Sequence, residues 1–155
     1  MGAVMSSGGV RRGRYFQSTF TQNFALIAMV QLAESLDVKK GVAFLLVQER
    51  GSDSGEVLFQ VVNNVMIRRP SNDEFLAGEA GTNYFGVAMG KLAVMMDTDA
   101  NSGSLIFYLR KGETPYRGGL VKFEGRYRIF VGFSGGTEDQ DVEIARTGMA
   151  MLFPK

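Results

Sequence analysis

Acid–base chemistry in this chain has to be carried by carboxylates, lysines and tyrosines, because the sequence contains no His and no Cys. The missing imidazole excludes a Ser-His-Asp triad and a His ligand to haem iron. The missing thiol excludes disulfides, thiolate nucleophiles and Cys-ligated metals. Burial can shift the pKa of a remaining carboxylate or amine into the working range. The catalytic candidates are Glu49, Glu79, Lys91 and Glu113.

Lys91 has the most unusual surroundings of these four. It is the one charge inside an apolar helical pattern over residues 83–97, in which Tyr84, Leu92 and Met95 recur. A lysine in this position either contacts a ligand or extends along the apolar surface until its ammonium group reaches water. The pattern leaves both alternatives open.

Two loops carry further candidates for ligand binding. Arg68 and Arg69 precede Pro70 in a long irregular segment, residues 63–82, where they either clamp a carboxylate or stay solvated, the commoner fate of surface arginines. Tyr116 and Arg117 stand beside paired glycines, where backbone can approach a ligand closely. Methionines near Lys91 either line a cavity for a flat ligand or fill the core. The predicted ligand-binding residues are Arg68, Arg69, Tyr84, Met89, Lys91, Tyr116 and Arg117.

The C-terminal segment, residues 118–152, predicts the elements that position these groups. Apolar residues alternate over 127–133, which indicates a strand paired with residues 120–123. Thr137 and Gln140 have the spacing of a capping box, so a helix should begin near Glu138. Carboxylates in its first turn already occupy the positive end of the helix dipole, so the preceding glycines predict a structural turn and no phosphate site.

The order of residues in this segment resembles the GlcG/HbpS-like family, also called the haem-degrading domain family, which includes the C-terminal domain of PduO-type proteins. The resemblance rests on Gly118, Gly119, Gly132, Ser134, Gly135, Gly136, Gln140, Asp141, Ala145 and Gly148. It extends more weakly upstream to about residue 21, where Lys91 falls in the position of a family Lys-Ala segment, and it departs at residues 120–121, where a proline is usual. The resemblance implies small-molecule binding, haem for some members, and multimeric assembly.

The rest of the chain predicts a single α+β domain over residues 21–155, preceded by a flexible N-terminal arm, residues 1–20. A helix is expected over 21–37, capped by Thr21 and buried through Phe24, Ile27 and Leu32. Strands are expected over 41–48, 56–62 and 105–109. Together with the C-terminal hairpin, they give an antiparallel sheet of about five strands with long helices packed on it.

Composition limits the partners. The net charge of +1 gives no electrostatic footprint for nucleic acid or an anionic membrane, and the apolar run 24–30 is too short to span a bilayer. Asp53 and Glu56 lie among turn residues without the spacing of a calcium loop, so no metal site is predicted. A chain without Cys is compatible with a cytoplasmic location.

Three functions therefore stay open. The first is a binding protein for an apolar or aromatic small molecule, with haem conceivable only through ligands such as Tyr84, Tyr108, Tyr116, a Met or Lys91. The second is a cofactor-free isomerase, lyase or cyclase that uses Glu, Asp, Lys or Tyr. The third is a structural homo-oligomer, suggested by a first helix that is apolar on most sides.

Overall fold

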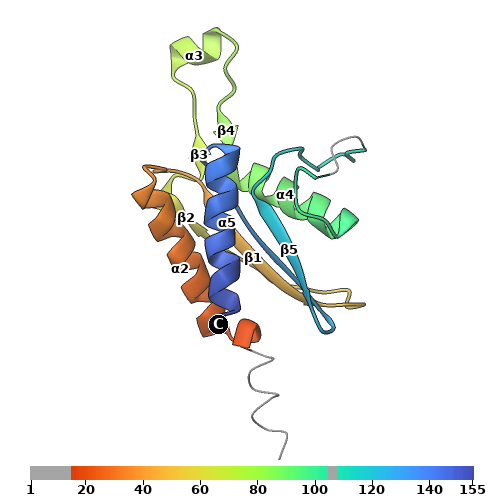
Figure 1. Cartoon of the computed structure of the whole chain (residues 1–155). Helices are drawn as coiled ribbons and strands as arrows, with labels where there is room; N and C mark the ends of the chain where they lie inside the picture. The colour runs from red at the N-terminus through yellow and green to blue at the C-terminus, as the bar shows by residue number, and fades with distance from the viewer. Residues whose placement is uncertain (1–14, 105–107) are drawn as a thin grey trace, which may run out of the picture.

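The computed structural model describes residues 15–104 and 108–155 and contains a four-stranded antiparallel sheet in the order β2-β1-β6-β5 (Figure 1). The strands are β1 (Val42–Glu49), β2 (Val57–Val61), β5 (Gly119–Glu124) and β6 (Tyr127–Ser134). The two central strands, β1 and β6, pair over their whole length, from Val42 opposite Ser134 to Glu49 opposite Tyr127. The end of β6 near Ser134 is therefore a fixed point from which the chain enters the last helix.

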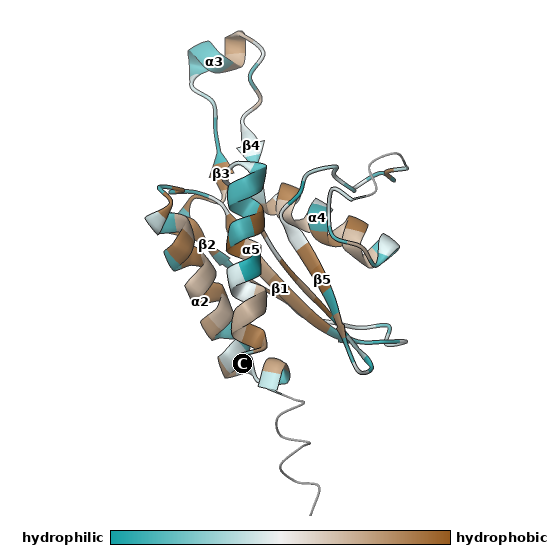
Figure 2. Cartoon of the chain, in the orientation of Figure 1, coloured by the Kyte–Doolittle hydropathy of each residue, from teal (hydrophilic) through white to brown (hydrophobic). Residues whose placement is uncertain are grey.

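The two faces of the sheet are covered by different helices. In β1, Ala43 and Leu45 pack against α2 (Thr19–Ser35) and α5 (Glu138–Leu152), whereas Phe44 and its neighbours on the same face pack against α4 (Tyr84–Thr98). This division follows from the alternation of side chains along a strand. Strand β1 is apolar at nearly every position because both of its faces are covered, as the hydropathy of the central strands in Figure 2 reflects.

The segment 63–82, predicted as an irregular loop, is instead an ordered arm that projects from the domain (Figure 1). After the short 3-10 helix η2 (Val62–Asn64), the strands β3 (Ile67–Arg68) and β4 (Thr82–Asn83) pair, and α3 (Asn72–Leu76) lies between them at the tip. The side chain of Ser71 caps α3 by accepting a hydrogen bond from the backbone N–H of Glu74. Helix capping and the pairing of two short strands order this segment, and a search for hydrophobic periodicity does not detect either of them.

The α+β class and the C-terminal hairpin and helix are confirmed. Thr137 Oγ1 accepts from the Gln140 amide at 3.2 Å, and Gln140 Oε1 accepts from the Thr137 amide at 2.9 Å, which completes the predicted capping box. The main sheet has four strands among the described residues, where about five were expected. The strand expected over 105–109 lies largely outside the described residues, since these exclude 105–107.

The first helix differs from its predicted orientation and start. It begins at Thr19 after Ser18, and Thr21 lies inside it, buried. Its buried face contains Ala25, Met29 and Ala33, while Phe24 and Ile27 are exposed. Apolar residues surround most of this helix, so periodicity could not decide which side faces the sheet.

Part of the segment predicted as an N-terminal arm, residues 15–20, belongs to the packed domain. Tyr15–Gln17 form a 3-10 helix, η1, and the side chain of Phe16 is buried against Tyr127 and Phe153. In the part of the chain that the structure describes, no helix is long and apolar enough to cross a membrane.

Candidate functional site

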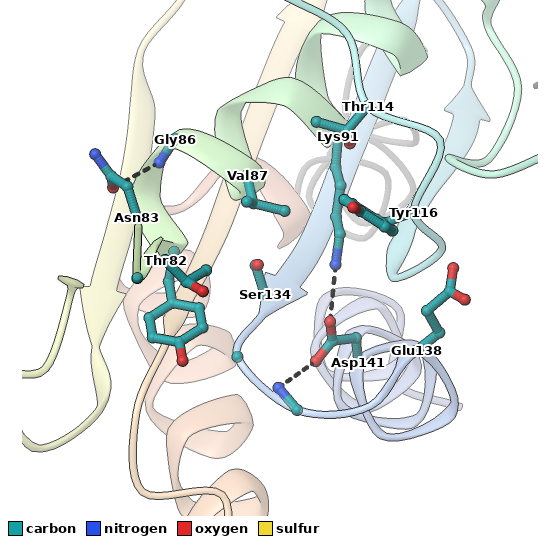
Figure 3. Close-up of a pocket in the computed structure, with 14 residues that line it drawn as sticks. Thr82, Asn83, Gly86, Val87, Lys91, Thr114, Tyr116, Ser134, Glu138 and Asp141 are labelled. Carbon is teal, nitrogen blue, oxygen red and sulfur yellow. Dashed lines mark hydrogen bonds and ion pairs between the residues drawn. The ribbon is translucent and has the colours of Figure 1, made fainter. Parts of the chain in front are cut away.

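A pocket of about 710 Å³ lies where the start of α4, the loop before β5 and the turn between β6 and α5 meet (Figure 3). The arm contributes its base through β4. The lining residues are Gly81, Thr82, Asn83, Tyr84, Gly86, Val87, Lys91, Thr114, Tyr116, Ser134, Gly135, Gly136, Glu138 and Asp141. This size and this mixture of aromatic walls and polar groups are those of small-molecule sites.

A buried ion pair lies in the wall of this pocket. The ammonium nitrogen of Lys91 is 2.8 Å from Asp141 Oδ2 and donates a second hydrogen bond, 2.7 Å long, to the carbonyl of Phe133. The exposed fractions are 1% for Lys91 and 4% for Asp141. Figure 3 shows the lysine extending from α4 toward the first turn of α5. The pair therefore joins the two helical layers beyond the end of β6.

The helical register of each partner places it on a buried face. Lys91 follows Ala88 by three positions and precedes Met95 by four, and all three side chains pack inward. Asp141 and Ala145 lie on the buried face of α5, together with Gly148.

Gly118 makes room for the ion pair. A Cβ at this position would lie 2.8 Å from the Lys91 ammonium nitrogen and 2.6 Å from the Asp141 Cβ, and the backbone φ of +119° is one that side-chain-bearing residues rarely adopt. Gly119 allows a similar approach by Met95 and Ser102. The paired glycines, predicted to admit a ligand, therefore admit protein groups.

Burial shifts the proton affinities of both partners. Loss of water lowers the pKa of Lys91, and the attraction of Asp141 opposes this shift. Loss of water likewise raises the pKa of Asp141, against the attraction of Lys91 and hydrogen bonds from the amides of Gly136 and Gly135. Both shifts are toward the neutral forms, and perturbed pKa values of this kind are typical of functional sites.

Two hydroxyl groups in the wall lack protein partners. Ser134 is 3% exposed, its hydroxyl points into the pocket beside the ion pair (Figure 3), and no hydrogen bond joins it to another described residue. The Oγ1 atom of Thr114 is also buried without a partner among the described residues. Because buried polar groups are normally hydrogen-bonded, the Thr114 hydroxyl indicates a place for a ligand or for water, and the Ser134 hydroxyl faces the same pocket.

Three backbone amides at the start of α5 donate to oxygen atoms of the protein itself. The Gly136 amide donates to Asp141 Oδ1 at 2.9 Å, and the capping box uses the amides of Thr137 and Gln140. Glu138 Oε1 accepts from the Arg117 amide at 2.7 Å. Internal oxygen atoms thus occupy part of the place that an anion takes at a free helix N-terminus.

Three of the predicted ligand-binding residues come together in the pocket: Tyr84, Lys91 and Tyr116. Arg117 is adjacent but pairs with Asp139 at 2.6 Å, and Met89 packs against the core between α4 and the sheet. Arg68 and Arg69 lie on the arm beside a separate hollow of about 370 Å³. Arg68 there contacts Glu74 and Glu79, each at 3.3 Å.

Among the four catalytic candidates, only Lys91 lines the pocket. Glu49 pairs with Arg126 at 3.5 Å, Glu79 pairs with Arg68, and Glu113 accepts from the Arg110 amide at 3.1 Å. These three carboxylates therefore pair with neighbouring groups outside the pocket.

Sequence reasoning did not assign six lining residues that carry polar side chains: Thr82, Asn83, Thr114, Ser134, Glu138 and Asp141. A signal existed for one of them. Asp141 shares the helical spacing of Ala145 and Gly148, and a charge on such a face favours a buried partner. The hydroxyl residues gave no such signal, because serine and threonine are common in turns.

No family model matches the sequence, and no curated protein matches it. Two solved structures match the fold. One is PduOC in complex with haem, with a TM-score of 0.58, 16% identity, and coverage of 86% of this chain and 93% of that one. The other is the Klebsiella pneumoniae protein ORFY of the family DUF336, with a TM-score of 0.52, 17% identity, and coverage of 87% and 90%. The chain therefore has the fold of PduOC and of the DUF336 protein, and the resemblance to the GlcG/HbpS-like family is confirmed at the level of the fold.

Proposed function

We propose that this protein binds a small molecule in the pocket between α4 and the β6–α5 turn. The observation that carries the proposal is a set of polar groups in the wall of a 710 Å³ pocket: the Thr114 hydroxyl, buried without a partner among the described residues, the Ser134 hydroxyl, and the Lys91 ammonium with its third N–H. Such convergent polar groups in a partly apolar cleft are the usual features of a ligand site. The haem complex of PduOC supports small-molecule binding by this fold.

The walls favour a ligand with an aromatic or apolar body. Tyr84, Tyr116 and Val87 line the pocket, and in Figure 3 Val87 and Tyr116 lie on opposite sides of Lys91. Aromatic side chains offer flat surfaces against which a ring can stack. The polar groups deeper in the wall would then fix the ligand's orientation.

Haem does not fit this pocket. Of the conceivable iron ligands, Tyr84, Tyr116 and Lys91 line the pocket, Lys91 is held by Asp141, and the chain has no His. The two propionate groups of haem would find little compensating charge, because the only Lys or Arg among the lining residues is Lys91, which is already paired with Asp141. Glu138 adds a further negative charge. The proposed ligand is therefore a smaller molecule.

A thermal-shift screen with a blocked pocket tests the proposal. Val87→Trp places a large ring in the pocket, whereas Val57→Trp introduces the same change on the half-exposed edge strand β2, outside this pocket. We expect compounds that raise the Tm of the wild type and of Val57→Trp but not that of Val87→Trp, because a ligand held only by the native state must stabilise it. If no compound shows this pattern, the proposed function is wrong.

A cofactor-free isomerase, lyase or cyclase is the second candidate. The titratable lining, Lys91, Glu138 and Asp141, favours it, with Lys91 and Asp141 as the proton-handling pair. Incubating each pocket ligand with protein and following it by NMR distinguishes binding from turnover. Ligands recovered chemically unchanged after long incubation would contradict an enzymatic role.

Self-association is the third candidate, and it is compatible with ligand binding. Phe20, Phe24 and Ile27 form a stripe on α2 with exposed fractions of 77%, 50% and 41%. The rings of Phe20 and Phe24 stack at 6.2 Å. Contiguous exposed apolar residues mark interaction surfaces, and we propose that a second copy covers this stripe.

Light scattering after size-exclusion chromatography tests this assembly. Phe20→Glu should yield a monomer, because it buries a charge at the proposed interface. Phe75→Glu, at the exposed tip of the arm, is the matched control and should leave the mass of the assembly unchanged. A wild-type monomer at micromolar concentration would contradict the proposal.

The composition of the chain supports proposals about its location and its partners. We propose a cytoplasmic location, because a chain without Cys needs no oxidising compartment. We expect no nucleic-acid or membrane partner, because a net charge of +1 gives little electrostatic attraction to either polyanion.

A further inference from the structure

We infer that the ligand of this pocket is uncharged and presents a carbonyl or hydroxyl oxygen to Lys91 and Ser134. The inference rests on the proposed binding function and names the chemistry of its ligand. It follows from which hydrogen-bonding groups in the wall are still available and from the charge of the groups around them.

Lys91 has one donor left. Its ammonium group carries three N–H bonds; one is used on Asp141 and one on the Phe133 carbonyl. The third finds no acceptor among the described residues, although the side chain is 1% exposed and lines the pocket. Leaving a buried donor of this kind without an acceptor is costly, so an oxygen atom of a ligand has a favourable place beside it.

Ser134 supplies a second hydrogen-bonding group on the same wall. Its hydroxyl can donate to a carbonyl oxygen, or it can both donate to and accept from a hydroxyl group. In Figure 3 this hydroxyl points into the pocket, beside the end of the Lys91 side chain and Asp141. The same pocket wall therefore offers a ligand oxygen two groups that can donate.

The charge of the wall disfavours an anion. Asp141 balances Lys91, and Glu138 leaves the lining residues with one net negative charge. The Gly136 amide, which could hold a carboxylate, donates to Asp141, and the Thr137 and Gln140 amides are used by the capping box. Lys40 lies on an adjoining hollow, with its ammonium nitrogen 5.8 Å from the centre of the Tyr84 ring, and does not line this pocket.

Three small aromatic probes of similar shape test the inference by NMR titration. Acetophenone presents an uncharged carbonyl, ethylbenzene lacks the oxygen, and benzoate carries a negative charge. We expect acetophenone to bind between about twofold and tenfold more tightly than ethylbenzene, the range of one net hydrogen bond. Benzoate should bind more weakly than acetophenone, because burying an unpaired charge is costly.

Ser134→Ala isolates the serine's contribution with little effect on folding. It should reduce the preference for acetophenone over ethylbenzene while leaving ethylbenzene binding unchanged, and Ser54→Ala, in the exposed β1–β2 turn, should change neither. Benzoate binding as tightly as acetophenone, an unchanged preference in Ser134→Ala, or no binding of acetophenone would each overturn the inference. The proposed function would survive these outcomes as long as the Val87→Trp variant still loses ligands that the wild type and Val57→Trp bind.

Discussion

The ammonium nitrogen of Lys91 lies 2.8 Å from a carboxylate oxygen of Asp141, which is 50 positions further along the chain. This contact joins α4, on one face of the sheet, to the first turn of α5, on the other. Gly118 passes beside it without a side chain. The same two groups stabilise the fold and line the pocket, so changes to them should alter both stability and ligand binding.

Removing one partner of the buried pair should be strongly destabilising. We expect Lys91→Met to lower the free energy of unfolding by about 3–5 kcal/mol, because Asp141 is then a buried charge without a partner. The double variant Lys91→Met, Asp141→Asn should lose less than the sum of the two single changes. Urea unfolding measures each value. Arg110→Met is the control: it breaks an exposed pair with Asp97 and should cost at most about 1 kcal/mol.

The stability of Asp141→Asn should depend on pH in a definite direction. Without the carboxylate, burial lowers the pKa of Lys91 further below its ordinary value of 10.5. At pH values between the lowered pKa of Lys91 in the folded variant and its ordinary pKa in the unfolded chain, the unfolded chain binds more protons than the folded one. The stability of the variant therefore rises with pH across that window. The deficit of the variant relative to the wild type should therefore shrink as the pH rises from neutral toward 10.5. Asp139→Asn, which loses an exposed contact with Arg117, should show a difference from the wild type that does not vary with pH in this range.

Gly118→Ala should destabilise the fold more than a substitution at another glycine of similar backbone conformation. Gly112 has φ +90°, and nothing lies within 4 Å of an added Cβ, so Gly112→Ala measures backbone strain alone, about 1–3 kcal/mol. At Gly118 the added Cβ also displaces the ion pair. Denaturant unfolding of both variants measures the difference. Equal losses would show that the ion pair adjusts to a side chain at position 118.

The arm arginines should not contribute to ligand binding in the pocket. The double variant Arg68→Ala, Arg69→Ala should retain the affinity of the wild type for compounds found in the screen, because neither residue lines the pocket. Tyr116→Ala should weaken aromatic ligands severalfold, since a stacked aromatic contact contributes about 0.5–1.5 kcal/mol. Calorimetric titration measures both. A large loss in the arginine variant would place the ligand against the arm.

Local sequence rules were sufficient for the C-terminal part of the fold. The alternation over 127–133 and the spacing of Thr137 and Gln140 each depend on residues close in the chain, and both elements are present as predicted. The same rules missed the arm, whose strands β3 and β4 have two residues each. Such short elements show no periodicity, and their order comes from a cap at Ser71 and the contacts of Arg68.

The candidate site, like the fold, was predictable from the sequence only in part. The sequence by itself established which chemistry is available, since a chain without His and Cys must use carboxylates, amines and hydroxyls. It also identified Lys91 as a charge within an apolar helix face. Only the tertiary structure decided that its partner is Asp141 and that Ser134 and Tyr116 lie in the same wall. The physical reason is that helical and strand periods indicate which side of an element is buried, whereas the packing of distant elements decides which buried groups meet.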